Sequence, residues 1–191
     1  MTKKFIFGEQ KGLYRSGYSL VELLVVISIM LTILFVVLFK YPLFSDQKTL
    51  QLYAQDISLT AREAQQYSLA GKENSENQFV TYGIFYTATT QKITFFADAN
   101  NDGTYSSSPT DTILKEIIVS PPISIQSVKD DTLADVSEFT VLYNRSIPEP
   151  VITVKRGNQS TFNVNNVTIT LARSTETKTV EIWDSGLIVI K

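Results

Sequence analysis

A single carboxylate, Glu22, interrupts an otherwise uncharged apolar segment that extends over residues 18–39. As an α-helix these 22 residues would be about 33 Å long, because each residue adds about 1.5 Å. The hydrocarbon core of a bilayer is about 30 Å thick, so the segment predicts a membrane-spanning helix. A carboxylate inside such a helix is costly, and by default it marks a functional position.

Three other interpretations explain less of this segment. A secretory signal peptide also begins with basic residues and an apolar core, but that core is shorter and a small-residue cleavage site follows it. Here the core is long, and Lys40-Tyr41-Pro42 follows it. A plain single-pass anchor leaves the acidic residue unexplained. A lipoprotein signal is excluded, because the chain has no cysteine to acylate.

The residues around the acid form a specific pattern. A basic leader ends at Gly17, Tyr18 and Ser19 follow, and Glu22 is fifth after the glycine. This pattern resembles the N-terminus of bacterial type IV prepilins and type II secretion pseudopilins. The resemblance implies that a prepilin peptidase cuts the Gly17–Tyr18 bond and methylates the new amine. Tyrosine at this place is a departure, since phenylalanine or methionine is commoner in the family.

The same resemblance implies a location and a set of partners. The chain would cross the bacterial cytoplasmic (inner) membrane once, with its C-terminal domain outside the cytoplasm, and would later enter a pilus or pseudopilus fibre. Its partners would be other pilin or pseudopilin subunits, the prepilin peptidase and the inner-membrane assembly platform.

The acid can be understood physically, because an ionised carboxylate in hydrocarbon requires a cation partner or a proton. Cleavage after Gly17 would create an amine at Tyr18, four residues before Glu22 and on the same helix face. Across two packed subunits, Glu22 of one could pair with the amine of the next, which would favour a helical fibre and fix its axial register. The family is understood to use the residue in this way. The alternative is a protonated glutamic acid without a partner.

Composition limits the remaining function classes. The 191 residues suffice for one globular domain after the anchor. The formal net charge is −2 and the leader contributes +3, so the mature chain is near −5, the wrong sign for bulk attraction to nucleic acid. The chain has no histidine and no cysteine, which excludes Ser/His/Asp and Cys/His catalytic arrangements. We therefore expect no enzyme and no catalytic residues.

Beyond the apolar segment, Pro42 predicts a kink or break of the helix near Tyr41. Helix should resume over residues 46–69, where a narrow stripe of mostly small side chains follows helical spacing and suits close packing on a sheet. This stripe consists of Leu50, Ile57, Ala61, Ala64 and Ser68. Gly71 is the expected stop signal, and Glu73 to Gln78 read as a polar loop.

From Phe79 onward, short runs rich in valine, isoleucine, threonine and aromatic residues predict β-strands. The predicted strands are 79–87, 92–97, 113–120, 123–128, 138–143, 151–155, 167–172, 179–183 and 187–190. Turn signals separate them, among them Pro148-Glu149-Pro150, and the last two strands form a hairpin at Asp184-Ser185-Gly186. The fold class is therefore α+β, with a long N-terminal helix packed on an antiparallel β-sheet domain, as the resemblance to type IV pilins also implies.

The order of these parts resembles the FimT/GspH-like group of minor pilins and pseudopilins. The residues that carry this looser likeness are Ala61-Arg62-Glu63-Ala64, the run from Phe95 to Gly103, and the terminal hairpin around Gly186. The expected organisation is a leader peptide at 1–17, a transmembrane and assembly helix at 18–41, an amphipathic half of the helix at 42–71 and a β-rich domain at 72–191.

The loop after the second predicted strand is the candidate for site chemistry. Asp98, Asn100 and Asp102 supply oxygen atoms at alternate positions before a glycine, as in the first half of an EF-hand-type calcium loop. Position twelve would be Pro109, where a bidentate glutamate is needed, although Asp111 is near enough to substitute in an irregular loop. The alternative is a turn, in which Asp, Asn and Gly are favoured for backbone reasons. We favour the turn, because the closing ligand is missing.

The aromatic residues predict a core rather than a binding platform. Phe85, Phe95, Phe96, Phe139 and Trp183 lie in strand patterns and are expected to pack under the helix. A stacking platform for single-stranded nucleic acid would need interleaved Lys or Arg. Some DNA-binding pilins of this group carry an arginine-rich motif beside the C-terminal glycine, whereas the residues after Gly186 contain no arginine. We therefore expect no DNA-binding residues.

These features together predict a structural minor subunit of a type IV pilus or type II secretion pseudopilus. The alternative is a tip-exposed binding module for DNA uptake or adhesion. Such a module would show a patch on loops such as Ser106–Thr112 or Arg156–Thr161, which are polar without a distinct charge.

Overall fold

The computed structural model describes residues 17–72, 80–107, 110–145, 147–159 and 161–191. The basic leader up to residue 16, the expected loop Glu73–Gln78 and Phe79 at the start of the first predicted strand lie outside the described residues. The chain divides into two compact units, Met1–Pro42 and Leu43–Lys191.

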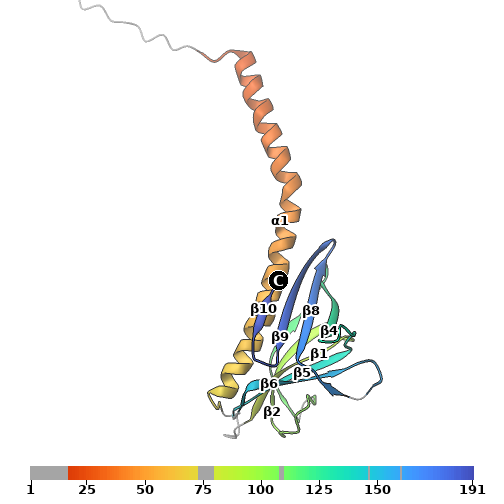
Figure 1. Cartoon of the computed structure of the whole chain (residues 1–191). Helices are drawn as coiled ribbons and strands as arrows, with labels where there is room; N and C mark the ends of the chain where they lie inside the picture. Colours follow the sequence, from red (N-terminus) through yellow and green to blue (C-terminus); the bar gives the residue numbers. More distant parts are fainter. Residues whose placement is uncertain (1–16, 73–79, 108–109, 146, 160) are drawn as a thin grey trace, which may run out of the picture. The chain divides into compact units, whose positions relative to one another are not determined.

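One helix, α1 (Leu20–Leu69), contains 50 residues and belongs to both units (Figure 1). The break predicted near Tyr41 is therefore wrong. A proline inside a helix removes one backbone hydrogen bond and crowds the preceding turn, at a cost of about 3 kcal/mol. Ending and restarting the helix at Pro42 would instead leave several N–H and C=O groups without intrahelical partners on each side. Continuing the helix is the less costly solution.

Within the first unit, the helical stretch Leu20–Phe39 is long and apolar enough to cross a membrane. It has 20 residues and a mean hydropathy of 3.0, and none of it is buried inside the protein. Its length as a helix is about 30 Å, which matches the hydrocarbon core of a bilayer. It is the one helix among the described residues that meets this test, which rests on length and composition.

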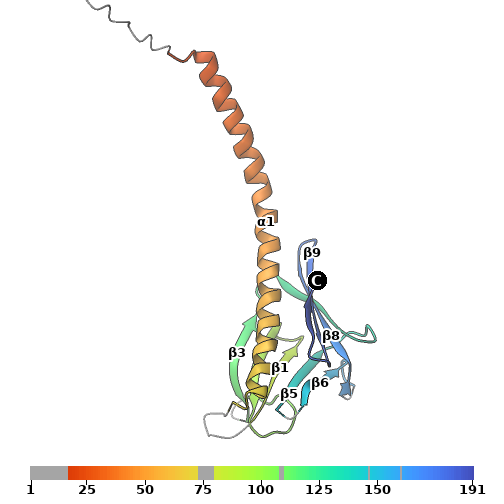
Figure 2. The same cartoon turned by 60° about the vertical axis from the view of Figure 1, so that its left-hand side comes forward.

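Within the second unit, the described residues form two antiparallel sheets, and the overall class is α+β as predicted (Figures 1 and 2). The six-stranded sheet has the order β3-β2-β1-β5-β6-β7, and the four-stranded sheet has the order β10-β9-β8-β4. The strands are β1 (Thr81–Thr87), β2 (Lys92–Asp98), β3 (Thr112–Ile118), β4 (Ser124–Asp130), β5 (Glu138–Asn144), β6 (Ile147–Lys155), β7 (Phe162–Asn163), β8 (Asn166–Arg173), β9 (Glu176–Trp183) and β10 (Ile188–Ile190). The nine predicted strands are all present with slightly different ends, and the two-residue β7 is additional.

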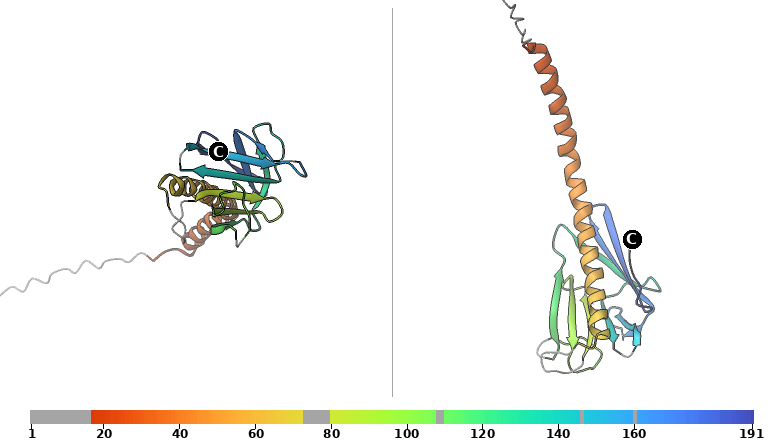
Figure 3. Two further views of the ribbon diagram at one scale, coloured as in Figure 1. Left: turned by 90° about the horizontal axis from the view of Figure 1, so that it is seen from below. Right: turned by 90° about the vertical axis from the view of Figure 1, so that its left-hand side faces the viewer.

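The C-terminal half of α1 packs its small side chains against both sheets, between which it runs in Figure 3. The five residues of the predicted stripe are at most 1% exposed, and Ala54 lies in the same stripe. The apolar residues of the stripe share one core with buried residues of β1, β2, β5, β8 and β9. Alanine and serine allow the helix backbone to approach the sheets closely, so this part of the prediction is confirmed.

The helix ends where the sequence predicted. The N–H of Gly71 donates to the carbonyl of Ser68 at 3.1 Å, and the N–H of Lys72 donates to that of Tyr67 at 3.0 Å. These two bonds are the pattern of a Schellman motif, which requires a left-handed residue after the helix. Gly71 supplies it with a φ of +60°.

Strand β6 includes the segment Pro148-Glu149-Pro150 that was expected to be a turn, so that expectation is wrong. The prolines lie where the pairing of β5 with β6 shifts register, between the pairs Leu142–Val151 and Asn144–Ile147. Proline cannot donate to a sheet ladder, and it is tolerated at such irregularities and at edges.

The aromatic residues pack on both faces of the larger sheet. Phe95 lies on the helix face, where its ring centroid is 5.6 Å from that of Tyr67 in α1. Phe85 and Phe96 lie on the opposite face, where Tyr105 covers them with centroid distances of 4.5 and 5.0 Å. Their predicted position under the helix is therefore wrong, because alternate strand residues face opposite sides. Of the other two residues, Phe139 is buried and Trp183 is half-buried.

A buried ion pair closes the turn that follows β4. One oxygen of Asp130, Oδ1, accepts hydrogen bonds from the N–H groups of Thr132 and Ala134 at 2.9 and 3.1 Å. The other oxygen, Oδ2, accepts from Nε of Arg156 at 2.6 Å. Burial alone would raise the pKa of Asp130, but the hydrogen bonds from Thr132, Arg156 and Ala134 together hold that pKa below its ordinary value.

We predict that Asp130→Ala lowers the free energy of unfolding by about 3 kcal/mol, because it removes the buried acceptor of the Thr132 and Ala134 N–H groups and of the Arg156 guanidinium. Asp135→Ala is the control. It removes an 85% exposed carboxylate at 3.8 Å from Lys129, so its effect should be about 0.5 kcal/mol or less. Urea unfolding of the full chain in detergent micelles, followed by the fluorescence of Trp183, measures both.

The pH dependence of the same pair has a definite sign. Because the pKa of Asp130 is depressed in the folded state, the pair stabilises the protein above the unfolded-state value of about 3.9 and loses this effect as the pH falls further. The difference between wild type and Asp130→Ala should therefore shrink below about pH 4. A constant difference down to pH 2 would contradict the assignment.

Candidate functional site

Gly17, Tyr18 and Ser19 form a short non-helical segment immediately before α1. The side chain of Tyr18 is 84% exposed. A Cβ atom placed on Gly17 would meet no heavy atom within 4 Å. Within the described residues, the Gly17–Tyr18 bond is therefore open to approach by an enzyme.

Ser19 is the N-cap of α1. Its Oγ accepts a hydrogen bond from the N–H of Val21 at 3.2 Å, and its carbonyl accepts one from the N–H of Leu23 at 3.1 Å. A serine followed three residues later by glutamate is the sequence of a capping box, and Glu22 lies in the first helical turn. This spacing is a sequence signal for a helix start, and it would have predicted the beginning of α1.

Glu22 is exposed, and it forms no hydrogen bond or ion pair with any described residue. The apolar side chains of the span around it are exposed as well, including Leu20 (79%) at its start and Phe39 (66%) at its end. The positive end of the helix dipole favours a carboxylate at this position, typically by less than about 1 kcal/mol. That is small compared with the cost of transferring a charge into hydrocarbon.

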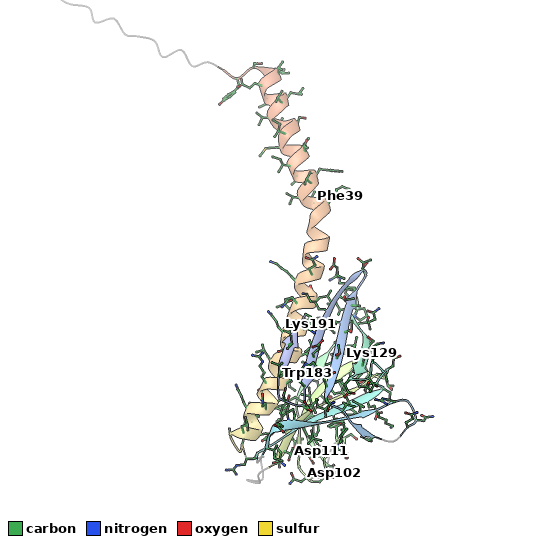
Figure 4. All side chains as sticks on the ribbon, in the orientation of Figure 1. Phe39, Asp102, Asp111, Lys129, Trp183 and Lys191 are labelled. Carbon is green, nitrogen blue, oxygen red and sulfur yellow. The ribbon has the colours of Figure 1, made fainter. Side chains whose placement is uncertain are left out.

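The second candidate site is the segment that connects β2 and β3, in which Figure 4 labels Asp102 and Asp111. Asp98 and Asp111 anchor the loop, with exposed fractions of 1% and 2%. The N–H of Gly103 donates to Oδ2 of Asp98 at 2.9 Å. The N–H groups of Ser106 and Ala99 donate to the two oxygens of Asp111 at 2.6 and 3.3 Å.

Asp102 and Asn100 occupy the exposed side of the same loop. Oδ1 of Asp102 accepts hydrogen bonds from the hydroxyl and the N–H of Thr104, both at 2.8 Å, and its Oδ2 accepts one from the amide of Asn100 at 2.7 Å. These bonds lower the pKa of Asp102, with the Thr104 hydroxyl as the largest cause. The structure thus brings all four predicted residues into one loop, and their oxygens accept hydrogen bonds from the loop itself.

The carboxylates of this loop repel one another. Burial raises the pKa of Asp98, and the nearby charges of Asp111 and Asp102 raise it further, against the lowering effect of the Gly103 N–H. A cation would relieve this repulsion. Among the described residues, however, no group of three or more His, Cys, Asp or Glu side chains is arranged to hold a metal ion. Pro109, at the place of the closing ligand, lies outside the described residues.

The loops considered for a tip-binding surface are described only in part. Residues 108 and 109 of the first and residue 160 of the second lie outside the described residues. In the second loop, the guanidinium of Arg156 is engaged by Asp130.

Comparison with known proteins gave no match, whether to a protein-family profile, to a curated protein or to a solved structure.

We predict that calcium stabilises the full chain only slightly. A ligand in hundredfold excess over its Kd stabilises a folded protein by about 2.7 kcal/mol, which a complete EF-hand would reach in millimolar calcium. The closing ligand is missing here, so the thermal midpoint with calcium should stay close to that with chelator. Asp98→Ala should lower the midpoint equally in both conditions, because it removes an anchor of the loop. A large calcium-dependent rise that Asp102→Ala abolishes would instead establish a metal site.

Proposed function

We propose that this chain is a structural minor subunit of a type IV pilus or a type II secretion pseudopilus. A prepilin peptidase cleaves it after Gly17, and its N-terminal helix carries it into the fibre. The observation that carries the proposal is the single acid, Glu22, in the first turn of an exposed apolar helix and five residues after Gly17, whose bond to Tyr18 is open.

The helix is consistent with two tasks in such a subunit. Its first half, Leu20–Phe39, is suited to cross the membrane. Its second half supplies the buried stripe of the β-rich domain. The opposite side of that second half is partly apolar, with Leu52 and Leu59 64% and 62% exposed and seven residues apart. Two helical turns separate these leucines, so they form a ridge that a neighbouring subunit could cover.

In this proposal, assembly neutralises the charge of Glu22. Cleavage produces an amine at Tyr18, and the amine of one subunit approaches the carboxylate of its neighbour within the membrane. Pairing offsets part of the cost of burying each charge, so the pair favours the packed state over isolated subunits that hold the charges unpaired. The pair also selects one axial offset between subunits, because only that offset places the two groups together.

The β-rich domain remains outside the cytoplasm in this arrangement, first at the inner membrane and then on the fibre. Its helix-plus-sheets architecture is compatible with a pilin-like domain of the FimT/GspH-like group. The other partners would be further pilin or pseudopilin subunits and the inner-membrane assembly platform.

We predict that Gly17→Glu blocks maturation, because a peptidase that seats glycine at the cleaved bond has little room for a side chain. Intact-mass spectrometry of membrane fractions should show a chain beginning at Tyr18 for wild type and at Met1 for the variant. A wild-type chain that keeps Met1 in cells with an active prepilin peptidase would refute the proposal.

We predict that Glu22→Val leaves cleavage intact but lowers incorporation into fibres at least about tenfold, because the partner of the charge exists only in the assembled state. Thr32→Val is the control, since the Thr32 hydroxyl donates to the carbonyl of Ser28 in the same helix at 2.8 Å and needs no partner. Immunoblots of sheared fibres and of membranes measure both quantities. Wild-type incorporation of the cleaved Glu22→Val chain would show that the acid has no assembly role.

A further inference from the structure

The edges of the two sheets differ in how they are protected against pairing with another strand. In the six-stranded sheet, the β7 end is short, and the uncovered part of β6 contains Pro148 and Pro150, which cannot donate to a new strand. In the four-stranded sheet, β10 has three residues, and Arg62 of α1 donates to the carbonyl of Ile188 at 3.5 Å.

The β4 edge is closed by the protein's own groups. The side-chain amide of Gln91 takes the place of a neighbouring strand, since its Nε2 donates to the carbonyl of Ile125 at 3.2 Å and its Oε1 accepts from the N–H of Ile125 at 2.7 Å. Further along β4, the N–H of Val136 donates to the carbonyl of Val128 at 2.8 Å. An added strand would have to displace both contacts.

Strand β3 has no such protection among the described residues. It is seven residues long, contains no proline, and lies at the rim of its sheet beside α1 (Figure 2). In an antiparallel pair, the backbone groups of every second residue point towards the neighbouring strand. The N–H of Val119 donates to the carbonyl of Gln91, so the backbone groups of Ile117 and Lys115, two and four residues earlier, also point towards β2. The N–H and C=O groups of Glu116 and Ile118 therefore point away from the sheet, and nothing described accepts or donates to them.

The side chains of β3 are unusually apolar for an open edge. Ile113, Leu114 and Ile118 are 39%, 44% and 58% exposed. An unpaired edge of this kind is a template for strand addition, which combines backbone hydrogen bonds with contacts to alternate side chains.

The charges on β3 indicate what kind of strand it can accept. Lys115 is paired with Asp56 of α1 at 2.5 Å, and Glu116 is paired with Lys92 of β2 at 2.6 Å. Both charges are thus neutralised within the protein, and the edge offers no unpaired charge to an incoming strand. An uncharged, apolar extended segment is the complementary occupant.

A second copy of β3 fits this requirement less well, because it carries Lys115 and Glu116. Two-fold antiparallel pairing of all seven residues places Lys115 opposite Lys115, and a shift in one direction places Glu116 opposite Glu116. A shift in the other direction centres the pairing on Leu114, the extra residue of a β-bulge opposite β2. The other described edges of a second copy are closed, as shown above.

We propose that the β3 edge, Thr112–Ile118, binds an extended apolar segment of a different protein by strand addition. The bound segment extends the six-stranded sheet by one strand and covers Ile113, Leu114 and Ile118. This binding is independent of the proposed role in fibres, since it uses no residue of the N-terminal segment.

A labelled peptide tests the proposal on the full chain in detergent micelles. The probe is the capped, uncharged peptide of residues 93–97, Ile-Thr-Phe-Phe-Ala, because β3 already pairs with that side-chain pattern on its inner edge. Fluorescence anisotropy should show binding to wild type. Ile118→Pro should weaken it at least about tenfold, because the variant removes an outward N–H and leaves pairing with β2 intact. Ile118→Thr, which keeps that N–H, should stay within about threefold of wild type.

A second measurement does not depend on the folding of a variant. The same peptide with N-methyl groups on alternate amides cannot form a ladder, so it should not bind wild-type protein. Absence of binding by the unmodified peptide, equal binding to Ile118→Pro and wild type, or equal binding of the N-methylated peptide would each overturn the proposal.

Discussion

The close contact between the C-terminal half of α1 and the two sheets is the interaction on which the rest of the domain depends. Each sheet has an apolar face on the side of the helix that needs a cover, and the stripe from Leu50 to Ser68 covers both of these faces. The stripe is narrow because most of its residues are small, so helix and sheets approach closely and little space remains for water. A larger side chain at Ala61 or Ala64, both fully buried, would push the layers apart.

Much of this arrangement follows from local patterns in the sequence. The span, the buried stripe, the glycine stop and the nine longer strands each have a periodic or turn signal within a few residues. The prediction of a helix break at Pro42 failed because it considered the proline alone. The cost of one lost hydrogen bond in a continuous helix has to be compared with the larger cost of two new helix ends. Phe85 and Phe96 show a second failure. Their face depends on the register of β1 and β2 and on Tyr105, which arrives from a loop.

The candidate sites also differ in how far the sequence alone predicts them. Gly17, Ser19 and Glu22 lie within six residues, so the sequence alone places them together. The loop from Asp98 to Asp111 is also contiguous, yet its carboxylates bind the N–H groups of their own loop, a choice that composition does not reveal. The open β3 edge has no sequence signal at all. It emerges only when the sheet order is known and when Gln91, distant in sequence from β4, is seen to occupy the neighbouring edge.

The hydroxyl of Ser68 has a mechanical consequence. It donates to the carbonyl of Tyr143 in β5 and accepts from the N–H of Tyr82 in β1 at 3.1 Å, so it stands between two strands of the sheet. Alanine side chains offer little resistance to sliding along the helix axis, whereas this pair of hydrogen bonds fixes the axial position of α1. A force that pulls α1 along its axis would therefore strain the hydrogen bonds of Ser68 and the ion pair between Lys115 and Asp56 before it displaced the apolar side chains. Together with the contact of Arg62 to the carbonyl of Ile188, these polar contacts hold the helix in register along the sheets.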